Sequence, residues 1–247
     1  MRPPIPKTKV EEAVEIINSI MPDDDFNEFK YMRCLRLLKE IEPFTAKDLV
    51  NMLRSIIELY AGNMSKAKDL ALLNYEISSD FQVLRNAAYV FQQLMALDWE
   101  VKVMEKIIDI SEKLNLDPGI NLPESHHLSF FLSGNLSLAK GHFRNEKTDD
   151  LFESFSSIQE ELNISDKSLK DILQIVHELM IESGTRYNAL EYSCIEGDFL
   201  LTIYLNDSHN EISRLNTEVA KRCYRSGLLD ELNKISYLFL PDEGKKI

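Results

Sequence analysis

The sequence predicts a mainly α-helical protein with a C-terminal α+β part. Apolar residues recur at helical spacing through the first 163 residues, whereas alternating apolar residues, typical of half-buried strands, appear after them. The 247 residues include only eight glycines and eight prolines, so breaks between elements are few. We therefore predict two domains: a helical-hairpin repeat or bundle over residues 1–163, and a small two-layer module over residues 164–247.

The first predicted helices follow a proline-rich start. A first helix is expected to align Val10, Val14, Ile17 and Met21 on one face. The acidic run Asp23–Asp25 suits the cap and first turn of a second helix. The next helix is expected to begin with Thr45 as its cap and Asp48 reaching back, and to end at Gly62.

Two helical hairpins are predicted on either side of residues 78–80. The second helix of the first hairpin runs over residues 65–77, and its packing side contains Ala67, Leu70, Ala71 and Asn74. The first helix of the next hairpin is expected to bury Val83, Leu84, Ala87, Ala88, Phe91 and Leu94. Its partner is expected to turn inward Val101, Met104, Ile108 and Leu114.

This order of helix, short turn and helix resembles the tetratricopeptide family, in which 34-residue units stack into a solenoid. Ala67 and Ala71 fall near the family's small positions on the second helix, and Ala88 and Phe91 suit its small and aromatic positions on the first. Ser79 departs from the family's usual terminal proline, and the spacing of the second unit slips by one or two residues.

A third, poorer unit can be read in residues 130–162, with Ala139 and Phe143 at the corresponding positions. The resemblance thus covers roughly residues 46–162 and implies a surface that binds a protein or peptide. A plain helical bundle explains the same periodicity.

The C-terminal segment predicts the element order α-β-β-α-β. Its first helix is expected to bury Leu169, Ile172, Leu173, Val176 and Met180 and to end at Gly184. Two alternating runs flank the turn "EGD" and place inward Leu190, Tyr192 and Cys194, then Phe199, Leu201, Ile203 and Leu205. The second helix turns inward Ile212, Leu215, Val219 and Cys223, Gly227 follows it, and "ISYLFLP" is the last strand. We expect helices on one side of a mainly antiparallel sheet.

The net charge of −13 disfavours binding to a nucleic-acid backbone and favours a basic protein or peptide partner. Residues 1–163 contain 18 Lys and Arg against 27 Asp and Glu, and residues 164–247 contain 10 against 14. The longest apolar runs are too short to cross a membrane, and the start lacks the apolar core of a secretory signal. We therefore expect a cytoplasmic protein with no membrane partner.

Candidate chemical groups are few. Cys34, Cys194 and Cys223 show no metal-ligand spacing and are expected to be buried thiols. The run "HELMIE" at His177 lacks the second histidine of a helical zinc motif, so a surface or half-buried histidine is expected. Glu124, His126 and His127 lie close in sequence but are expected at a loop or helix start. Asp149 and Asp150 are expected to cap a helix. No catalytic residue, metal site or cofactor is predicted.

The leading hypothesis is a non-catalytic adaptor or regulatory protein that presents an acidic helical groove to a basic partner. The expected contact residues are Tyr89, Trp99, Glu100 and Glu105, and the C-terminal module is expected to support either a homodimer or a second contact. One alternative is an immunity or anti-defence inhibitor that blocks a basic nuclease or mimics nucleic acid. Another is a metal-dependent enzyme or regulator that uses His126, His127 or His177.

Overall fold

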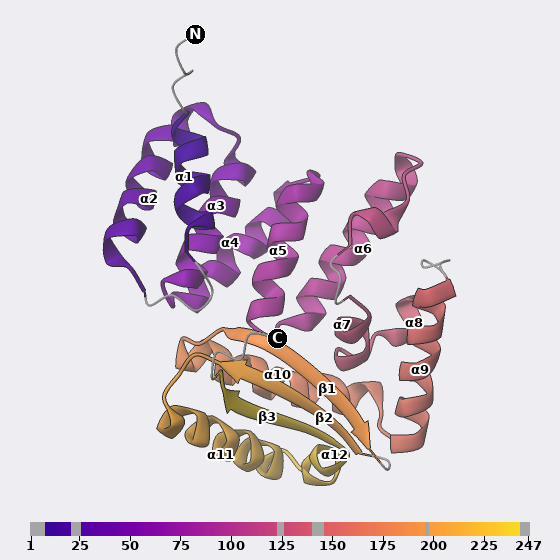
Figure 1. Cartoon of the computed structure of the whole chain (residues 1–247). Helices are drawn as coiled ribbons and strands as arrows, with labels where there is room; N and C mark the ends of the chain where they lie inside the picture. Colours follow the sequence, from indigo (N-terminus) through magenta and orange to yellow (C-terminus); the bar gives the residue numbers. More distant parts are fainter. Residues whose placement is uncertain (1–7, 21–25, 123–125, 140–145, 196–197, 243–247) are drawn as a thin grey trace. The chain divides into compact units, whose positions relative to one another are not determined.

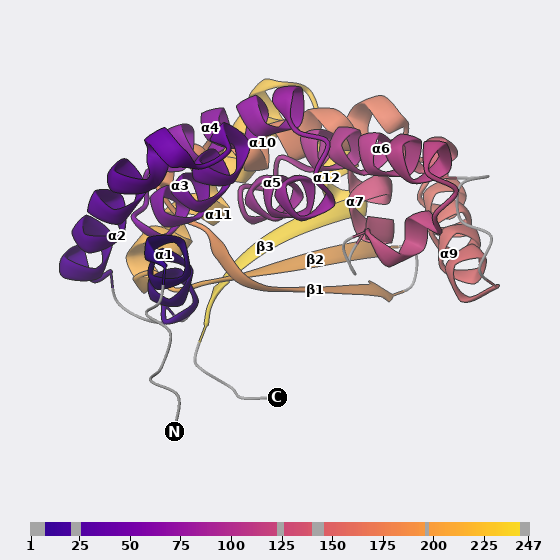
Figure 2. The ribbon, with the colours of Figure 1, turned by 90° about the horizontal axis from the view of Figure 1, so that it is seen from above.

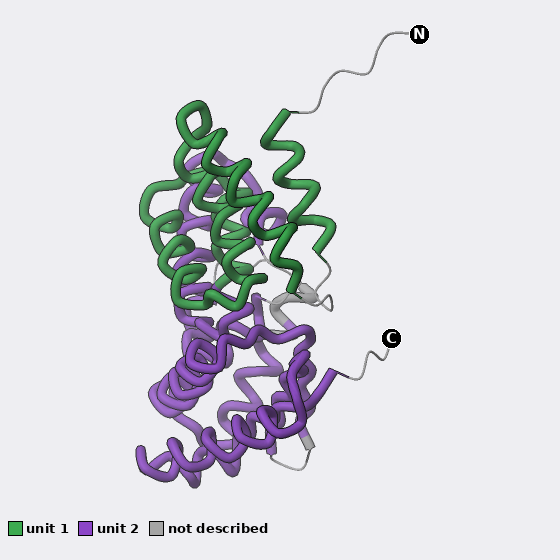
Figure 3. The backbone as a smooth tube through the Cα atoms, turned by 90° about the vertical axis from the view of Figure 1, so that its left-hand side faces the viewer, with its two compact units in different colours: residues 1–90 green, residues 91–247 purple. Residues whose placement is uncertain are grey.

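The computed structural model describes residues 8–20, 26–122, 126–139, 146–195 and 198–242 (Figure 1). The chain divides into two compact units, residues 1–90 and 91–247 (Figure 3). The boundary predicted at residue 163 falls inside the second unit, and independent folding of residues 164–247 stays a prediction. The expectations for Met21, Asp23–Asp25, Glu124, Phe143 and the turn at residues 196–197 lie outside the described residues.

The first unit is helical throughout its described elements. It contains α1 (Lys9–Asn18), α2 (Glu28–Ile41), the 3-10 helix η1 (Glu42–Phe44), α3 (Lys47–Tyr60), α4 (Met64–Ile77) and most of α5 (Phe81–Gln93). A capping box starts α1, because the Thr8 hydroxyl accepts from the Glu11 N–H while the Glu11 carboxylate accepts from the Thr8 N–H. Ile17 is buried and Val10 and Val14 pack against the same core, as predicted.

The cap predicted for α3 is wrong. The cap residue is Ala46 and its side chain makes no cap hydrogen bond. The Asp48 carboxylate accepts instead from the N–H of Leu49 at 2.9 Å and from the Ser78 hydroxyl at 2.8 Å. Ser78 follows α4, so Asp48 joins the start of α3 to the end of α4 instead of closing the first turn of its own helix.

The helical hairpins recur at a repeat-like interval. Helices α3 and α5 begin at residues 47 and 81, which are 34 apart, and α4 and α6 (Leu97–Lys113) begin at residues 64 and 97, which are 33 apart. The small residues predicted to pack are fully buried: Ala67, Ala71, Ala87 and Ala88 are at most 1% exposed. Membership of the tetratricopeptide family stays a prediction, whereas the mainly helical fold class is confirmed.

The third unit predicted over residues 130–162 differs from the first two. These residues contain the end of α7 (His126–Leu132), the one-turn α8 (Leu136–Ala139) and the long α9 (Glu146–Leu162). The inward position predicted for Leu114 is also wrong, because α6 ends at Lys113 and Leu114 is 57% exposed. The short η2 (Pro118–Ile120) follows before α7.

The C-terminal part of the second unit has the predicted elements in the predicted order, with one further short helix, α12, before the last strand. It comprises α10 (Asp166–Ser183), β1 (Tyr187–Ile195), β2 (Asp198–Leu205), α11 (His209–Arg225), α12 (Leu229–Lys234) and β3 (Ile235–Pro241). The sheet has the strand order β1-β2-β3 and is mixed, because β1 pairs antiparallel with β2 and β2 pairs parallel with β3. The mainly antiparallel sheet was therefore a wrong expectation. The crossover through α11 and α12 returns the chain to the end where β2 began.

One face of the sheet forms the core of the second unit. Figures 1 and 2 show α10 and α11 along the same side of the strands. The alternating β2 residues Phe199, Leu201, Ile203 and Leu205 are all 0% exposed, as predicted. The inward residues predicted for α10 and α11 are buried as well.

Strand β1 does not bury the face predicted for it. The register places Tyr192 opposite Leu201 and Cys194 opposite Phe199, so these side chains lie on the core side of the sheet. Tyr192 is nevertheless 43% exposed and Cys194 is exposed. The two edges of the sheet are covered unequally, because α11 and α12 contact β3 at the other edge, where Ile235, Tyr237 and Phe239 are buried.

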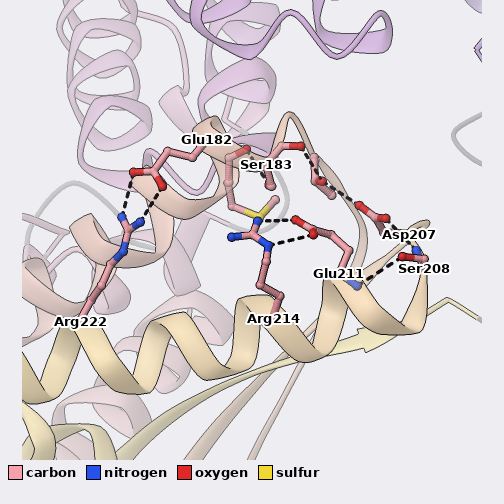
Figure 4. Close-up of polar contacts among 9 residues, drawn as sticks. Glu182, Ser183, Asp207, Ser208, Glu211, Arg214 and Arg222 are labelled. Carbon is pink, nitrogen blue, oxygen red and sulfur yellow. Dashed lines mark hydrogen bonds and ion pairs between the residues drawn. The ribbon is translucent and has the colours of Figure 1, made fainter.

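Polar contacts connect α10 and the start of the strands to α11 (Figure 4). The Arg222 guanidinium donates to both oxygens of Glu182, at 2.9 and 2.6 Å, and holds the pKa of that carboxyl below its ordinary value. The Thr185 hydroxyl donates to Asp207 at 3.1 Å, and Ser208 caps α11. The Arg222–Glu182 pair is exposed, so it fixes orientation more than it adds stability.

Gly134 closes α7 at a point where no side chain fits. Its φ is +60°, and a Cβ would lie 2.9 Å from the Cα of Asp166 at the start of α10. We predict that Gly134→Ala lowers the free energy of unfolding by about 3 kcal/mol or more, because left-handed strain adds to a clash with backbone. Gly227→Ala is the matched control, since Gly227 has φ +70° and nothing within 4 Å of the new Cβ. It should lose only about 1 kcal/mol. Equal losses in urea unfolding would contradict the close approach of α7 and α10.

Candidate functional site

The four predicted contact residues occupy different environments. Tyr89 lies on α5 in the first unit and is half-buried. Trp99 and Glu105 are half-buried residues of α6 in the second unit. Glu100 is 0% exposed, so the assumption that it offers an exposed charge is wrong. A groove that includes both Tyr89 and Trp99 stays a prediction.

The Trp99 ring contacts two other residues of the second unit, Phe91 and Lys102. Its ring stacks on Phe91 with centroids 6.1 Å apart, and the Lys102 ammonium lies 3.7 Å from the centroid of the Trp99 ring. A cation over an aromatic face is attracted by the ring quadrupole. Lys102 therefore covers one face of the Trp99 ring, and its charge offsets part of the acidity of α6.

Glu100 is a structural carboxyl between α6 and α7. The Ser129 hydroxyl on α7 donates to Glu100 Oε2 at 2.8 Å, whereas Oε1 has no hydrogen-bond partner among the described residues. Burial raises the pKa of Glu100 to about 8, and the bond from Ser129 acts in the opposite direction. Glu100 is thus mostly protonated at neutral pH and contributes little surface charge. Its position between Leu97 and Met104 on the inward face was the sequence signal that could have revealed this.

The acidity of the chain is concentrated in residues 91–163. This stretch has 6 Lys and Arg against 13 Asp and Glu, whereas residues 1–90 have 12 against 14. Four exposed carboxylates lie along α9, at Asp150, Glu153, Glu160 and Glu161. Residues 150–162 contain no Lys or Arg. We call these four residues the α9 acidic face.

The capping role predicted for Asp149 and Asp150 is wrong, because α9 begins at Glu146 and both residues lie within the helix. The sequence signal for the acidic face was the pair Phe152 and Phe155. Their three-residue spacing marks the inward side of a helix, and the carboxylates occupy other positions around it.

Aromatic contacts determine which side of α9 faces solvent. Phe152 and Phe155 are 3% and 2% exposed. The Phe155 ring stacks on Phe131 of α7 with centroids 4.8 Å apart and lies 6.4 Å from Phe199 of β2. Phe131 in turn lies 5.1 Å from Phe199. The helix is therefore anchored to α7 and to the sheet through one side, which leaves its acidic face outward.

An open pocket of about 470 Å³ lies beside the C-terminal end of α9. It is lined by Leu136, Ser137, Ser156, Gln159, Glu160, Asn163, Ile164 and Asp166. Gln159 donates to Asp166 Oδ1 at 2.7 Å and to the carbonyl of Ile164 at 3.3 Å, which fixes the turn between α9 and α10. Glu160 therefore belongs to both the α9 acidic face and the pocket wall.

The chemistry of this pocket suits a cationic side chain. Two carboxylates, Glu160 and Asp166, lie on its wall, and the C-terminal end of a helix carries partial negative charge. The Lys234 ammonium already donates to the carbonyl of Asn163 at 3.1 Å, which illustrates the preference of this helix end for a cation. The pocket and the acidic face together form the candidate site.

The histidines do not assemble into a metal centre within the described part of the chain. No group of three His, Cys, Asp or Glu residues there could hold a metal ion. The rings of His126 and His127 lie 5.7 Å apart. Burial lowers the pKa of His127, and the neighbouring His126 lowers it further. His177 was expected at or near the surface but is 4% exposed, and its Nδ1 lies 2.7 Å from the carbonyl oxygen of Leu94.

Two of the three cysteines are buried and one is exposed. Cys34 and Cys223 are buried as predicted, and burial raises the pKa of each to about 11. Such thiols are poor nucleophiles at neutral pH. Cys194 is exposed, which corrects the prediction that all three cysteines are buried.

Comparison of the chain with protein-family models, with curated proteins and with solved structures finds no match. Within the described residues, no helix combines the length and the apolar character needed to span a membrane.

The raised pKa of Glu100 predicts a pH dependence of stability. Between its ordinary value of 4.5 and about pH 8, the folded state keeps a proton that the unfolded state releases, so stability falls as pH rises. We expect Glu100→Gln to remove this decline and to raise the melting temperature at pH 9 by about 5 °C relative to the wild type. At pH 5 the two proteins should differ by less than about 2 °C. Glu105→Gln is the matched control on the outer side of α6. Parallel pH profiles for wild type and Glu100→Gln would contradict the buried protonated carboxyl.

Proposed function

We propose that this chain is a non-catalytic binding protein that presents the α9 acidic face to a basic protein or peptide. The observation that carries the proposal is a run of four exposed carboxylates without a Lys or Arg in residues 150–162. These carboxylates lie on a helix whose other side is anchored by Phe155. A rigid array of like charge suits recognition of a basic surface and rejects phosphate.

Binding would proceed in two stages. The acidic stretch of residues 91–163 attracts a cationic partner at long range, over a Debye length of about 8 Å at physiological salt. A Lys or Arg of the partner then enters the pocket and meets Glu160 and Asp166. Trp99 and Glu105 on α6 remain predicted contacts for the same partner.

An inhibitor of a basic nuclease is a narrower form of this proposal, because the same carboxylates would cover a cationic nucleic-acid site. The metal-dependent alternative draws no support from the described histidines. His177 contacts a backbone carbonyl, and no described cluster offers three ligands.

The homodimer expected through the C-terminal module would use the open edge of β1. Within the described residues β1 pairs only with β2, and Glu191, Tyr192 and Ser193 on it are exposed. Exposed strand edges pair readily with a second strand. Sedimentation velocity over a range of concentrations tests this contact, and a monomer at the highest concentration would exclude it.

The experiment that tests the α9 acidic face uses Glu153→Lys combined with Glu160→Lys. Affinity capture from the native host with the wild-type chain, followed by mass spectrometry, should identify a basic partner that the double variant fails to retain. The association rate of that partner at 50 mM salt should fall about tenfold in the variant, since charge reversal acts mainly on the encounter. Raising salt to 500 mM should reduce this difference.

Asp171→Lys combined with Glu178→Lys is the matched control, because both residues are exposed on α10 and the charge change is the same. This control should retain the partner with an association rate within about threefold of the wild type. Equal capture by the α9 variant, or equal loss in both double variants, would overturn the assignment of the site to α9. A basic nuclease among the captured proteins would select the narrower proposal.

A further inference from the structure

Helix α2 carries large apolar side chains on its outward face. Phe29 is 76% exposed and Met32 is 56% exposed. Phe26, just before the helix, is 54% exposed, and its ring meets Tyr31 edge-on at 5.6 Å. This contact between the residue before the cap and the fourth helical residue is a hydrophobic staple, which fixes the start of α2.

The fold does not require these exposed side chains. The opposite side of α2 supplies the core of the first unit through Cys34, Leu37, Leu38 and Ile41, which are at most 8% exposed. A helix needs one apolar side to pack in a bundle. Phe29 and Met32 therefore add a second apolar area on the side that faces solvent.

Two arginines continue this outward face. Phe29, Met32, Arg33 and Arg36 follow one another at positions i, i+3, i+4 and i+7, which align on one side of a helix. The side chains of Arg33 and Arg36 are 53% and 83% exposed. Arg33 pairs with Glu12, and Arg36 pairs with Glu40 at 3.0 Å. We call these four residues the α2 stripe.

The charge of α2 is opposite to that of the whole chain. The helix contains four Lys and Arg against two Glu, within a protein of net charge −13. Exposed ion pairs such as those of Arg33 and Arg36 are weak and solvated, so both guanidinium groups can still bind an incoming carboxylate. Screening beyond about 8 Å at physiological salt makes this local charge more important than the distant acids.

We propose that the α2 stripe binds an amphipathic helical segment of an acidic partner protein. The apolar side of that segment packs on Phe29 and Met32, and its carboxylates, one helical turn further along, pair with Arg33 and Arg36. Charge complementarity selects this occupant, because a basic segment would meet two arginines. The site is separate from the α9 acidic face and has the opposite charge preference.

An anionic membrane surface also combines apolar and negatively charged groups. It suits the stripe less well, since an extended anionic surface would also come close to acids outside α2, whereas a helical segment contacts only the stripe and meets its local charge. The experiment therefore includes both probes.

The test is a selection of 18-residue helical peptides from a displayed random library against the intact wild-type chain. Enriched peptides should combine apolar residues at i, i+3 and i+4 with carboxylates one turn further on. Fluorescence anisotropy of the best synthetic peptide should then show at least a tenfold higher Kd for Arg33→Glu with Arg36→Glu, and likewise for Phe29→Ser with Met32→Ser.

Lys47→Glu with Arg85→Glu is the matched control, because both residues are exposed in the first unit and carry the same charge change. Its Kd should stay within about twofold of the wild type. The proposal would be overturned if the enriched peptides are basic or neutral, or if no peptide is enriched. It would also be overturned if the stripe variants bind the peptide as tightly as the wild type does. The membrane is tested by co-sedimentation of each protein with vesicles of phosphatidylglycerol and phosphatidylcholine. If the wild type and the control bind these vesicles and the stripe variants do not, the proposal is overturned in favour of a membrane.

Discussion

The contact among Phe131, Phe155 and Phe199 is the constraint on which the second unit depends. It brings together α7, α9 and β2, which are far apart in sequence, with ring centroids 4.8 to 6.4 Å apart. All three rings are at most 2% exposed. Buried aromatic rings contribute large apolar areas and prefer defined relative orientations. The cluster therefore fixes both the position of α9 and the side that it turns to solvent. These contacts also cross residue 163, where a domain boundary was expected.

Each candidate surface lies on a helix whose opposite side is already packed into a core. Phe155 anchors α9, so the carboxylates on its other positions form an acidic face. The core of the first unit anchors α2 in the same way, so its stripe can combine apolar and basic groups. In the two proposals, the units offer surfaces of opposite charge preference. A protein with both could bring a basic and an acidic partner to one chain, which is the role proposed for an adaptor.

Periodicity predicted most of the fold because a helix or strand reveals its buried side within a few residues. The inward residues of α5, α10, α11 and β2 were recovered in this way. The errors arose where the environment depends on distant segments. Cys194 is exposed because α11 and α12 contact β3 at the other edge of the sheet, and β3 is parallel to β2 because the crossover through these helices returns the chain to the end where β2 began. The local sequence pattern indicates neither the exposure of Cys194 nor the parallel pairing of β3.

The candidate site was predicted less well than the fold, for a related reason. Glu100 was taken as a surface acid from its chemistry, although its spacing from Leu97 and Met104 placed it on the inner side of α6. The carboxylates of α9 were overlooked because Asp150 was assigned to a cap. The pocket beside Glu160 needs the turn between α9 and α10 in three dimensions, and no sequence motif marks it.

Hydrogen exchange of α9 measured by mass spectrometry tests most directly whether the aromatic cluster holds the acidic face in place. In the wild type, peptides from residues 150–162 should be protected to within about tenfold of those from β2, because the rings couple the two elements. In Phe155→Ala, α9 should exchange at least about a hundredfold faster than β2. Free exchange of α9 in the wild type, or unchanged protection in the variant, would contradict the account.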